Sequence, residues 1–363
     1  MASGSELRAK RVLVAGAGAI GGITGGHMSR KVPGVLLYDR NKEHVARINE
    51  RGLLVGGCRG RVRFRVKAVD NLKEIEWEPD YVFIAVKSAL TRLLMEELAP
   101  RMGEKCVVVS LQNGINEYLI SEYVGKSRVF GIVTGWGATN KGAGALTQTS
   151  RGEFIVGALS GGRSAELREV KKLLGYCAPT KISSNIMGAK YGKLMMNGII
   201  NTLGAMTGVT LGEFISDPRG AIAFIKMWNE EAAILRSINI KLESFDPYLK
   251  ENTFQSRNGV EFLLALVVLY FVRRNAGGLT SSMLQDIRKG VRSENKYLPG
   301  HFLDINERGV AAPFIQKAYN MVEEIEDGKR DISMRNLDEL LSVGEVNPRW
   351  GKLFKWSALK LPK

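Results

Sequence analysis

The first half of the chain alternates short apolar runs with longer segments of mixed polarity. The segment 11–15 predicts a buried strand, and the continuous apolar runs at 81–86 and 106–109 are typical of strands that are covered on both faces. Helical patterns occupy 19–30 and 41–51. Further strands are expected at 35–38, 62–66, 129–133 and 154–156. Because strands and helices alternate, the sequence predicts an α/β fold with a doubly wound, mostly parallel sheet.

The pattern changes near residue 187. Long helical patterns dominate from there on, and no comparable strand pattern follows. The predicted helices cover 188–205, 221–238, 260–274 and 313–325. We therefore expect an α/β domain at 1–185 and an all-helical domain at 186–363, with a ligand bound in a crevice between them.

The longest uninterrupted apolar run is 262–272, eleven residues. A membrane-spanning helix needs about 20 apolar residues, so this run predicts a buried core helix or part of a dimer surface. Residues 1–11 lack the hydrophobic stretch of a secretory signal. The expected protein is soluble and cytoplasmic, makes no membrane contact and assembles as a homodimer.

Composition and charge narrow the class of protein further. Hydrophobic residues make up 45% and charged residues 25% of the chain, which excludes a disordered, collagen-like or disulfide-rich protein. The net charge is +15, but the basic residues are scattered, so we expect no nucleic-acid partner. The densest basic stretch, 349–363, also carries Trp350, Phe354 and Trp356 and is interpreted as a segment packed on the body.

Cysteine and histidine are scarce. The three cysteines are widely separated, and the three histidines offer few candidates for acid–base chemistry. These residues are Cys58, Cys106, Cys177, His27, His44 and His301. We therefore expect no disulfide framework, no metal site, and a catalytic residue of another type.

A glycine motif directly follows the first predicted strand and opens the first predicted helix. Its residues are Gly16, Ala17, Gly18, Ala19, Ile20 and Gly21. In that context the glycines let a pyrophosphate approach a helix N-terminus, where free N–H groups favour anions. An ordinary glycine-rich turn is the alternative. The context favours a Rossmann-type dinucleotide site in which Ala19 and Ile20 also contact the cofactor.

The second predicted strand ends at Asp39 and Arg40. An acidic residue about 20 positions after the glycines accepts hydrogen bonds from the adenosine ribose and repels a 2′-phosphate. Asp39 therefore favours NADH. Arg40 could instead pair with the 2′-phosphate of NADPH, so the choice between the two cofactors stays open.

Two further residues follow predicted parallel strands. Lys87 comes after the strand at 81–86, and Asn113 with Gly114 comes after the strand at 106–109. Open α/β sheets bind ligands at the carboxyl ends of their strands. The Asn-Gly pair is also a common turn dipeptide. Its place behind a buried strand favours a loop that faces a ligand.

Lys193, Asn197 and Asn201 are spaced four residues apart, so they share one face of a predicted helix. The residues around them are strongly apolar, and burying an ammonium and two carboxamides without partners is costly. Lys193 could also extend from a core helix while the asparagines cap nearby backbone. The spacing alone leaves a functional and a structural interpretation equally open.

Ser282 and Glu294 belong to a polar segment that follows the long apolar run. The structural interpretation is a helix that begins with a Thr or Ser cap and has a charged exposed face. Spacing alone does not bring Ser282 and Glu294 together.

Taken together, these motifs resemble those of the ketopantoate reductase family (2-dehydropantoate 2-reductases). Their order and approximate spacing hold from residue 11 to about 330. The lysine motif and the Ser-Ser-Met-Leu-Gln-Asp run are more specific than the glycine pattern. The shared residues are Gly16, Gly18, Gly21, Asn113, Gly114, Lys193, Asn197, Asn201, Ser281, Ser282, Asp286, Arg288, Glu294, Gly300 and Pro313.

The resemblance implies a Rossmann-type domain followed by an all-helical C-terminal domain. It also implies reduction of the 2-oxo acid 2-dehydropantoate to pantoate, with NADH or NADPH, on the route to coenzyme A. By this resemblance Lys193 is the general acid that protonates the C2 oxygen. Glu294 positions Lys193 and also contacts the cofactor.

The resemblance assigns the remaining residues to binding. Asn197, Asn201 and Ser282 would hold the substrate. Asn113 would bridge substrate and cofactor, and Lys87 would lie near the nicotinamide side of the cofactor.

Two departures from the family pattern keep alternatives open. The family usually prefers NADPH, whereas Asp39 favours NADH. The stretch 245–278 is longer and more apolar than the pattern implies, which would suit a reductase of another branched 2-oxo acid or of an opine-type substrate. A third alternative is a non-catalytic NAD(P)-sensing protein, for which the basic tail and the apolar stretch are the motivation.

Overall fold

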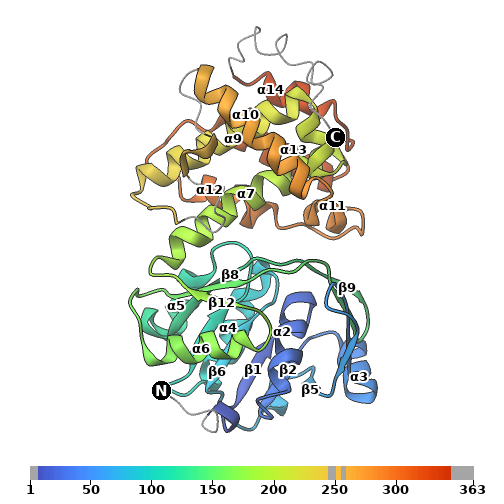
Figure 1. Ribbon diagram of the computed structural model, residues 1–363, viewed down its shortest axis with the longest axis vertical. Coiled ribbons are helices and arrows are strands. Elements are labelled where there is room, and N and C mark those ends of the chain that lie inside the picture. The colour runs from blue at the N-terminus through green and yellow to red at the C-terminus, as the bar shows by residue number, and fades with distance from the viewer. Residues whose placement is uncertain (1–6, 244–250, 255–258, 345–363) are drawn as a thin grey trace. The chain divides into compact units, whose positions relative to one another are not determined.

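The computed structural model describes residues 7–243, 251–254 and 259–344. The chain divides into two compact units, Met1–Lys190 and Tyr191–Lys363 (Figure 1). The predicted packing of the basic segment 349–363 lies outside the described residues.

An eight-stranded sheet forms the centre of the first unit. Its strands are β1 (Val12–Ala15), β2 (Val35–Tyr38), β5 (Lys67–Val69), β6 (Tyr81–Ile84), β7 (Val107–Ser110), β8 (Val129–Thr134), β11 (Phe154–Ala158) and β12 (Thr180–Ile182). Their order is β12-β11-β8-β7-β6-β1-β2-β5. Neighbouring strands run parallel except β8 and β11, which are antiparallel. The predicted α/β fold with a mostly parallel sheet is confirmed.

Alternate residues of these strands enter two separate cores, because successive side chains of a strand point to opposite faces. Val12 and Val14 join the core on one face, and Leu13 and Ala15 join the core on the other. Both faces of the sheet are therefore covered, which explains the continuous apolar runs in the sequence.

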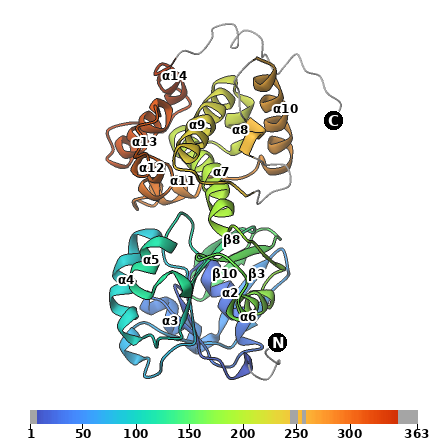
Figure 2. The ribbon, with the colours of Figure 1, turned by 90° about the vertical axis from the view of Figure 1, so that its left-hand side faces the viewer.

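The helices of the first unit cover both faces. They are α2 (Ala19–Ser29), α3 (Lys42–Arg51), α4 (Thr91–Leu98), α5 (Glu117–Val124) and α6 (Ala165–Gly175), with 3-10 turns at Leu72–Glu74, Ser88–Leu90, Ala99–Arg101 and Lys126–Arg128. Figure 2 shows α4 and α5 on one side of the sheet and α6 on the other. The predicted helices at 19–30 and 41–51 correspond to α2 and α3.

A second, four-stranded sheet was not predicted. It consists of β3 (Leu53–Gly57), β4 (Val62–Phe64), β9 (Ala138–Gly142) and β10 (Ala145–Gln148), in the order β4-β3-β10-β9. The strand expected at 62–66 is present as β4, but it ends at Phe64. The chain forms β4 up to Phe64 and then enters the large sheet as β5 at Lys67, so the alternating pattern spans parts of two sheets.

The described residues of the second unit form helices and loops, with no strand. Its helices are α7 (Ile186–Thr207), which begins in the first unit, α8 (Leu211–Ser216), α9 (Pro218–Ser237), α10 (Gly259–Ala276), α11 (Ser282–Ile287), α12 (Pro299–Asp304), α13 (Pro313–Glu326) and α14 (Asn336–Leu341), with 3-10 turns at Glu251–Phe254 and Asn295–Tyr297. The predicted all-helical C-terminal domain is confirmed. Among the described residues, no helix combines the length and the apolar composition that crossing a membrane requires.

Helix α10 corrects the expectation of a fully buried core helix. One face packs inward through Ala265, Leu266 and Leu269. The opposite face leaves Leu264 59% and Phe271 54% exposed. A run that is apolar all round a helix predicts burial on every side, but this helix is covered on one side only.

Candidate functional site

The glycine loop joins β1 to α2, and its glycines are required by the backbone. Gly16 has φ +102°, and a Cβ there would lie 2.7 Å from the backbone of Ala85 and of Val86. A Cβ on Gly21 would overlap the carbonyl oxygen of Gly16. Gly18 is the N-cap of α2, and the space around its Cα is open. The loop thus leaves room for a ligand at a helix N-terminus, the arrangement that a dinucleotide pyrophosphate fits.

The end of β2 holds this loop. The backbone N–H groups of Gly16 and Ala17 both donate to the carbonyl oxygen of Tyr38, at 2.8 and 3.1 Å. Asp39 follows directly and is half-buried, and its carboxylate accepts the backbone N–H of Asn41 at 3.0 Å. Arg40 is exposed. Asp39 therefore lies one residue from the strand end that supports the glycine loop, as the ribose interpretation requires.

The loops after β6 and β7 are joined by a polar network that was not predicted. Asn116 donates from Nδ2 to Ser88 Oγ at 3.0 Å and to the carbonyl oxygen of Asn113 at 2.9 Å. Gln112 donates from Nε2 to the carbonyl oxygen of Val86 at 2.9 Å and to Thr91 Oγ1 at 2.7 Å. The network brings the loop of Lys87 next to that of Asn113. The side chains of Lys87 and Asn113 are exposed.

A buried ion pair anchors the start of α7 beside the same loop. Lys190 Nζ pairs with Glu117 Oε1, and both side chains are at most 3% exposed. Lys190 Nζ also donates to the carbonyl oxygen of Gln112 at 3.3 Å. A Cβ on Gly131 would lie 3.2 Å from Lys190, so this glycine leaves room for the pair. Sequence reasoning missed Lys190, although it stands three residues before Lys193.

In the second unit Asn201 is the centre of a side-chain cluster. Its Oδ1 accepts the backbone N–H of Ser282 at 2.7 Å and Ser282 Oγ at 2.9 Å. Its Nδ2 donates to Asn197 Oδ1 at 2.9 Å. Ser281 caps α11, with Oγ accepting the N–H of Leu284 at 3.0 Å. The structure thus brings together Asn197, Asn201 and Ser282, and the adjacent serine supplies the predicted helix cap.

Lys193 lies one turn before Asn197 on α7 and is half-buried, whereas its neighbours Leu194 and Met195 are buried. Glu294 is half-buried and directly precedes the 3-10 turn at Asn295–Tyr297. The pairing of Glu294 with Lys193 stays a prediction.

Two adjacent glutamates of α9 lie in the interior of the second unit. Burial raises the pKa of Glu230 to about 7. The backbone N–H groups of Ile315 and Phe314 donate to its carboxylate and lower the pKa, but burial has the larger effect. Burial also raises the pKa of Glu231, which is fully buried. Among the described residues no group donates a hydrogen bond to either Glu231 oxygen. Both carboxyls therefore hold their protons to a higher pH than an exposed glutamate.

His301, in α12 of the second unit, is half-buried. Burial lowers its pKa to about 4, and its Nε2 lies 3.3 Å from the Tyr191 hydroxyl. The ring is therefore neutral near pH 7.

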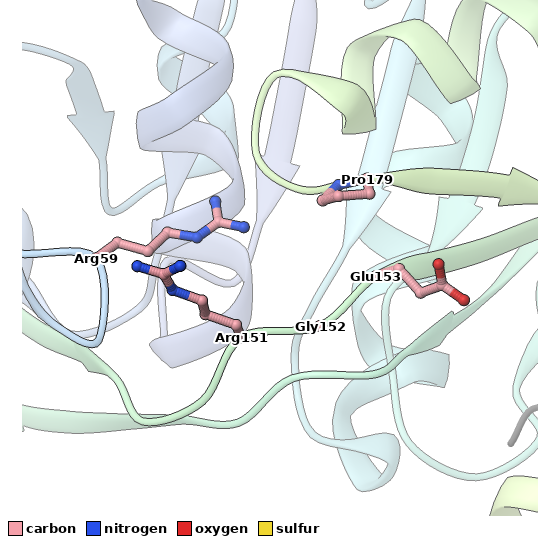
Figure 3. Close-up of a pocket in the computed structure, with 5 residues that line it drawn as sticks. All are labelled: Arg59, Arg151, Gly152, Glu153 and Pro179. Atoms are coloured by element: carbon pink, nitrogen blue, oxygen red, sulfur yellow. The ribbon is translucent and has the colours of Figure 1, made fainter.

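A cavity of about 670 Å³ in the first unit is separate from these residues. It is lined by Arg59, Arg151, Gly152, Glu153 and Pro179 (Figure 3). The charged side chains around it are engaged locally: Arg59 donates to the carbonyl oxygen of Cys177, and Glu153 pairs with Lys181 at 2.7 Å. No residue predicted for cofactor or substrate lines this cavity. In the described part of the chain, no group of His, Cys, Asp and Glu has the arrangement of a metal site.

Comparison with known proteins gives the class of protein. The family profile "Ketopantoate reductase PanE/ApbA" matches residues 12–161, and "Ketopantoate reductase PanE/ApbA C terminal" matches residues 185–326. The chain therefore belongs to the ketopantoate reductase family. Membership makes it an oxidoreductase that uses a nicotinamide dinucleotide, and the glycine loop is a cradle that fits such a group.

Individual relatives agree with this assignment. The 2-dehydropantoate 2-reductase of Pyrococcus horikoshii is 30% identical over 302 residues, which cover 81% of this chain and 90% of that protein. A PanE/ApbA family ketopantoate reductase from Ralstonia eutropha has the same fold, with a TM-score of 0.75 and 23% identity over 88% of this chain and 99% of that chain.

A solved structure of D-mandelate dehydrogenase with NADH and anilino(oxo)acetate also shares the fold. Its TM-score is 0.76, with 23% identity over 88% of this chain and 99% of that chain. The fold therefore occurs in dehydrogenases with different named substrates.

Proposed function

We propose that this chain reduces 2-dehydropantoate to pantoate with NADPH or NADH, and that Lys193 is the general acid. The observation that carries the proposal is the cluster of Asn197, Asn201 and Ser282, in which Asn197 lies one turn along α7 from Lys193. Asn197 and Ser282, held by Asn201 and close along the chain to one ammonium, suit a small substrate that has a carboxylate and hydroxyl groups.

Lys193 has two tasks in this mechanism. Reduction of a ketone develops negative charge on the carbonyl oxygen, and an ammonium next to that oxygen stabilises the charge and then supplies the proton. Glu294 positions the ammonium and balances its charge.

Asn201 fixes the donors and acceptors on the substrate side. Because its amide binds Asn197 and Ser282 at once, the rotamers of both are set before substrate arrives. Asn197 and Ser282 then bind the carboxylate and hydroxyl ends of the substrate.

The residues of the first unit would hold the cofactor. Gly16, Gly18 and Gly21 together with Ala19 and Ile20 would receive the pyrophosphate, and Asp39 and Arg40 would select between ribose and 2′-phosphate. Lys87 and Asn113, on the two loops that the polar network joins, would contact the nicotinamide half. Reduced nicotinamide bound there would supply the hydride.

A second candidate function keeps this mechanism and changes the substrate. The likeness of the fold to D-mandelate dehydrogenase supports a reductase of another 2-oxo acid. An opine-type substrate or a cofactor-sensing role without turnover would need the same cofactor loop, but the sensor would not need Lys193.

The experiment is a matrix of activities on the purified chain. NADH and NADPH are each combined with 2-dehydropantoate, other branched 2-oxo acids and phenyl-substituted 2-oxo acids, and kcat/KM is ranked. The proposal expects 2-dehydropantoate among the best substrates. A clear preference for another 2-oxo acid would favour the second candidate, and cofactor binding without oxidation of any substrate would favour the sensor.

We also propose that the chain forms a homodimer through α10, in the cytoplasm as the sequence predicts. Val260, Leu263, Leu264, Val267 and Phe271 are 47–70% exposed. Their spacing places them on one helix face, an apolar surface of the kind that marks a protein interface.

A second copy fits this face better than an unrelated partner. Glu261 lies in the first turn of α10, and Arg273 and Arg274 lie in the last turn. Two antiparallel copies of the helix would place the acidic first turn of each near the basic last turn of the other, a reciprocal charge pattern that suits a two-fold interface.

Sedimentation velocity at micromolar concentration tests the dimer. Wild type should sediment as a dimer, and Leu264→Glu with Val267→Glu should sediment as a monomer. Val291→Glu, which changes an exposed apolar residue outside α10, is the matched control and should stay dimeric. A monomeric wild type would contradict the proposal. A dimer that persists in the α10 variant would show that the interface does not involve this face of α10.

A further inference from the structure

His44 joins three parts of the first unit. It lies in the first turn of α3 and is 2% exposed. Its Nε2 is 2.9 Å from the carbonyl oxygen of Ala17, and its Nδ1 is 2.9 Å from the backbone nitrogen of Gly144. Both ring nitrogens therefore bind backbone that is distant in sequence.

The two contacts define the state of the ring. The backbone N–H of Gly144 can only donate, so Nδ1 must accept and the ring proton must be on Nε2. Nε2 then donates to Ala17. Only the neutral ring with this tautomer satisfies both buried backbone groups.

The Ala17 contact lies in the glycine loop itself. The N–H of Ala17 is already bound by the carbonyl oxygen of Tyr38 at 3.1 Å, so His44 holds the other side of the same residue. In a trans peptide the C=O and the following N–H point in opposite directions. Because His44 fixes the carbonyl of Ala17, it also fixes the direction of the N–H of Gly18, the N-cap of α2.

The Gly144 contact connects this loop to the small sheet. Gly144 lies in the turn between β9 and β10 with φ +69°, and its carbonyl oxygen accepts the N–H of Leu54 on β3 at 2.9 Å. A Cβ there would lie 2.6 Å from the side chain of Arg47 on α3. The turn therefore packs against α3 and β3, and these contacts fix the position of the N–H group that His44 accepts.

We infer that His44 is a positioning residue for the dinucleotide. It holds the Ala17–Gly18 peptide so that the N–H of Gly18 points to the pyrophosphate. The inference rests on the proposed cofactor role of the glycine loop and adds a residue outside the glycine motif that sets cofactor affinity.

Three variants of His44 and one control separate positioning from folding. His44→Gln keeps an amide N–H that can reach Ala17, His44→Asn keeps an acceptor for Gly144 only, and His44→Ala keeps neither. The control is Asn49→Ala. Asn49 lies on the same helix and makes the same kind of two-point bridge, but to Ala68 of β5, at 2.8 and 2.9 Å.

The readouts are the dissociation constants of NADH and NADPH from fluorescence titration, and the Tm of each full-length variant. We expect His44→Ala to raise the Kd about tenfold, with His44→Gln closer to wild type than His44→Asn. Asn49→Ala should lower the Tm by a similar amount but change the Kd less than about twofold. If His44→Ala fails to fold, the Gln and Asn variants carry the comparison.

Two outcomes would overturn the inference in distinguishable ways. If wild type binds both dinucleotides and the His44 variants bind them equally well, His44 has no positioning role and the proposed function stands. If wild type binds neither dinucleotide, the proposed cofactor site fails and the inference fails with it.

Discussion

The two units offer candidate binding groups of different kinds. In the first unit the groups that would meet a cofactor are mainly backbone groups at strand ends, held by Tyr38 and His44. In the second unit the groups that would meet the substrate are side chains of a cluster whose members, Asn197, Asn201 and Ser282, hydrogen-bond one another. Backbone can bind a group common to many proteins, whereas side chains distinguish one substrate from another.

This difference predicts how variants should behave. Changes in the first unit should act on cofactor affinity or on folding. Changes in the cluster of the second unit should act on turnover and leave cofactor affinity nearly constant.

The largest effect is expected for Lys193→Ala. Removal of a general acid that also stabilises the developing charge should lower kcat about 10³-fold. Stopped-flow and steady-state assays measure kcat, and fluorescence titration measures the cofactor Kd on the same sample. A variant with kcat near wild type would show that Lys193 is not the acid. A large rise in the cofactor Kd would contradict the expectation that changes in the second unit leave cofactor affinity nearly constant.

The next largest effect is on stability, from Glu117→Gln. The change leaves the ammonium of Lys190 buried without a carboxylate, which should lower the free energy of unfolding by about 3 kcal/mol. Urea denaturation measures the loss. The double variant Glu117→Leu with Lys190→Met removes both charges and should recover most of it. A single variant as stable as wild type would show that the pair contributes nothing to folding.

A smaller effect is expected for Asn201→Ala. Loss of the amide frees Asn197 and Ser282, which should lower kcat/KM about 30-fold while the cofactor Kd stays constant. Ser281→Ala is the matched control, because its hydroxyl caps α11 and binds the backbone of Asn201 rather than its side chain. The control should lower stability by about 1 kcal/mol. Equal losses of kcat/KM in both variants would contradict the role of the Asn201 amide.

The smallest effect is the pH dependence of folding that Glu230 adds. Its pKa is raised to about 7 in the folded state, so the folded chain holds a proton that the unfolded chain releases between about pH 4.5 and 7. The free energy of unfolding should therefore fall as pH rises through this window, by about 2 kcal/mol. Glu230→Gln should flatten that part of the profile in denaturation at pH 5 and pH 8. An identical slope in the variant would show that Glu230 titrates normally.

The sequence predicts those features of the site that are local in the chain. The glycine loop needs only a strand, a turn and a helix in succession, and Lys193, Asn197 and Asn201 share a face because they are one helical turn apart. The contact between Asn201 and Ser282 joins residues 81 positions apart, and the Lys190–Glu117 pair joins residues 73 apart. No local pattern contains such distances.

Other features were missed because their signals are weak or ambiguous. The strands β9 and β10 are short and mostly polar, and the turn between them contacts His44 through Gly144. The ring of His44 binds the backbone of Ala17 and Gly144, which are 27 and 100 positions away in the sequence. The helical pattern around His44 therefore could not indicate its role. For α10, the composition could not indicate which face is covered.

We propose that the residues of the first unit bind the cofactor and those of the second unit bind a 2-oxo acid in one reaction. A single-turnover experiment tests it most directly: enzyme in excess is mixed with limiting NADPH, or NADH, and 2-dehydropantoate, and both the oxidised cofactor and pantoate are quantified. We expect one pantoate to form for each reduced cofactor that is consumed. Cofactor that binds tightly but stays reduced, with 2-dehydropantoate and with every other 2-oxo acid supplied, would contradict it.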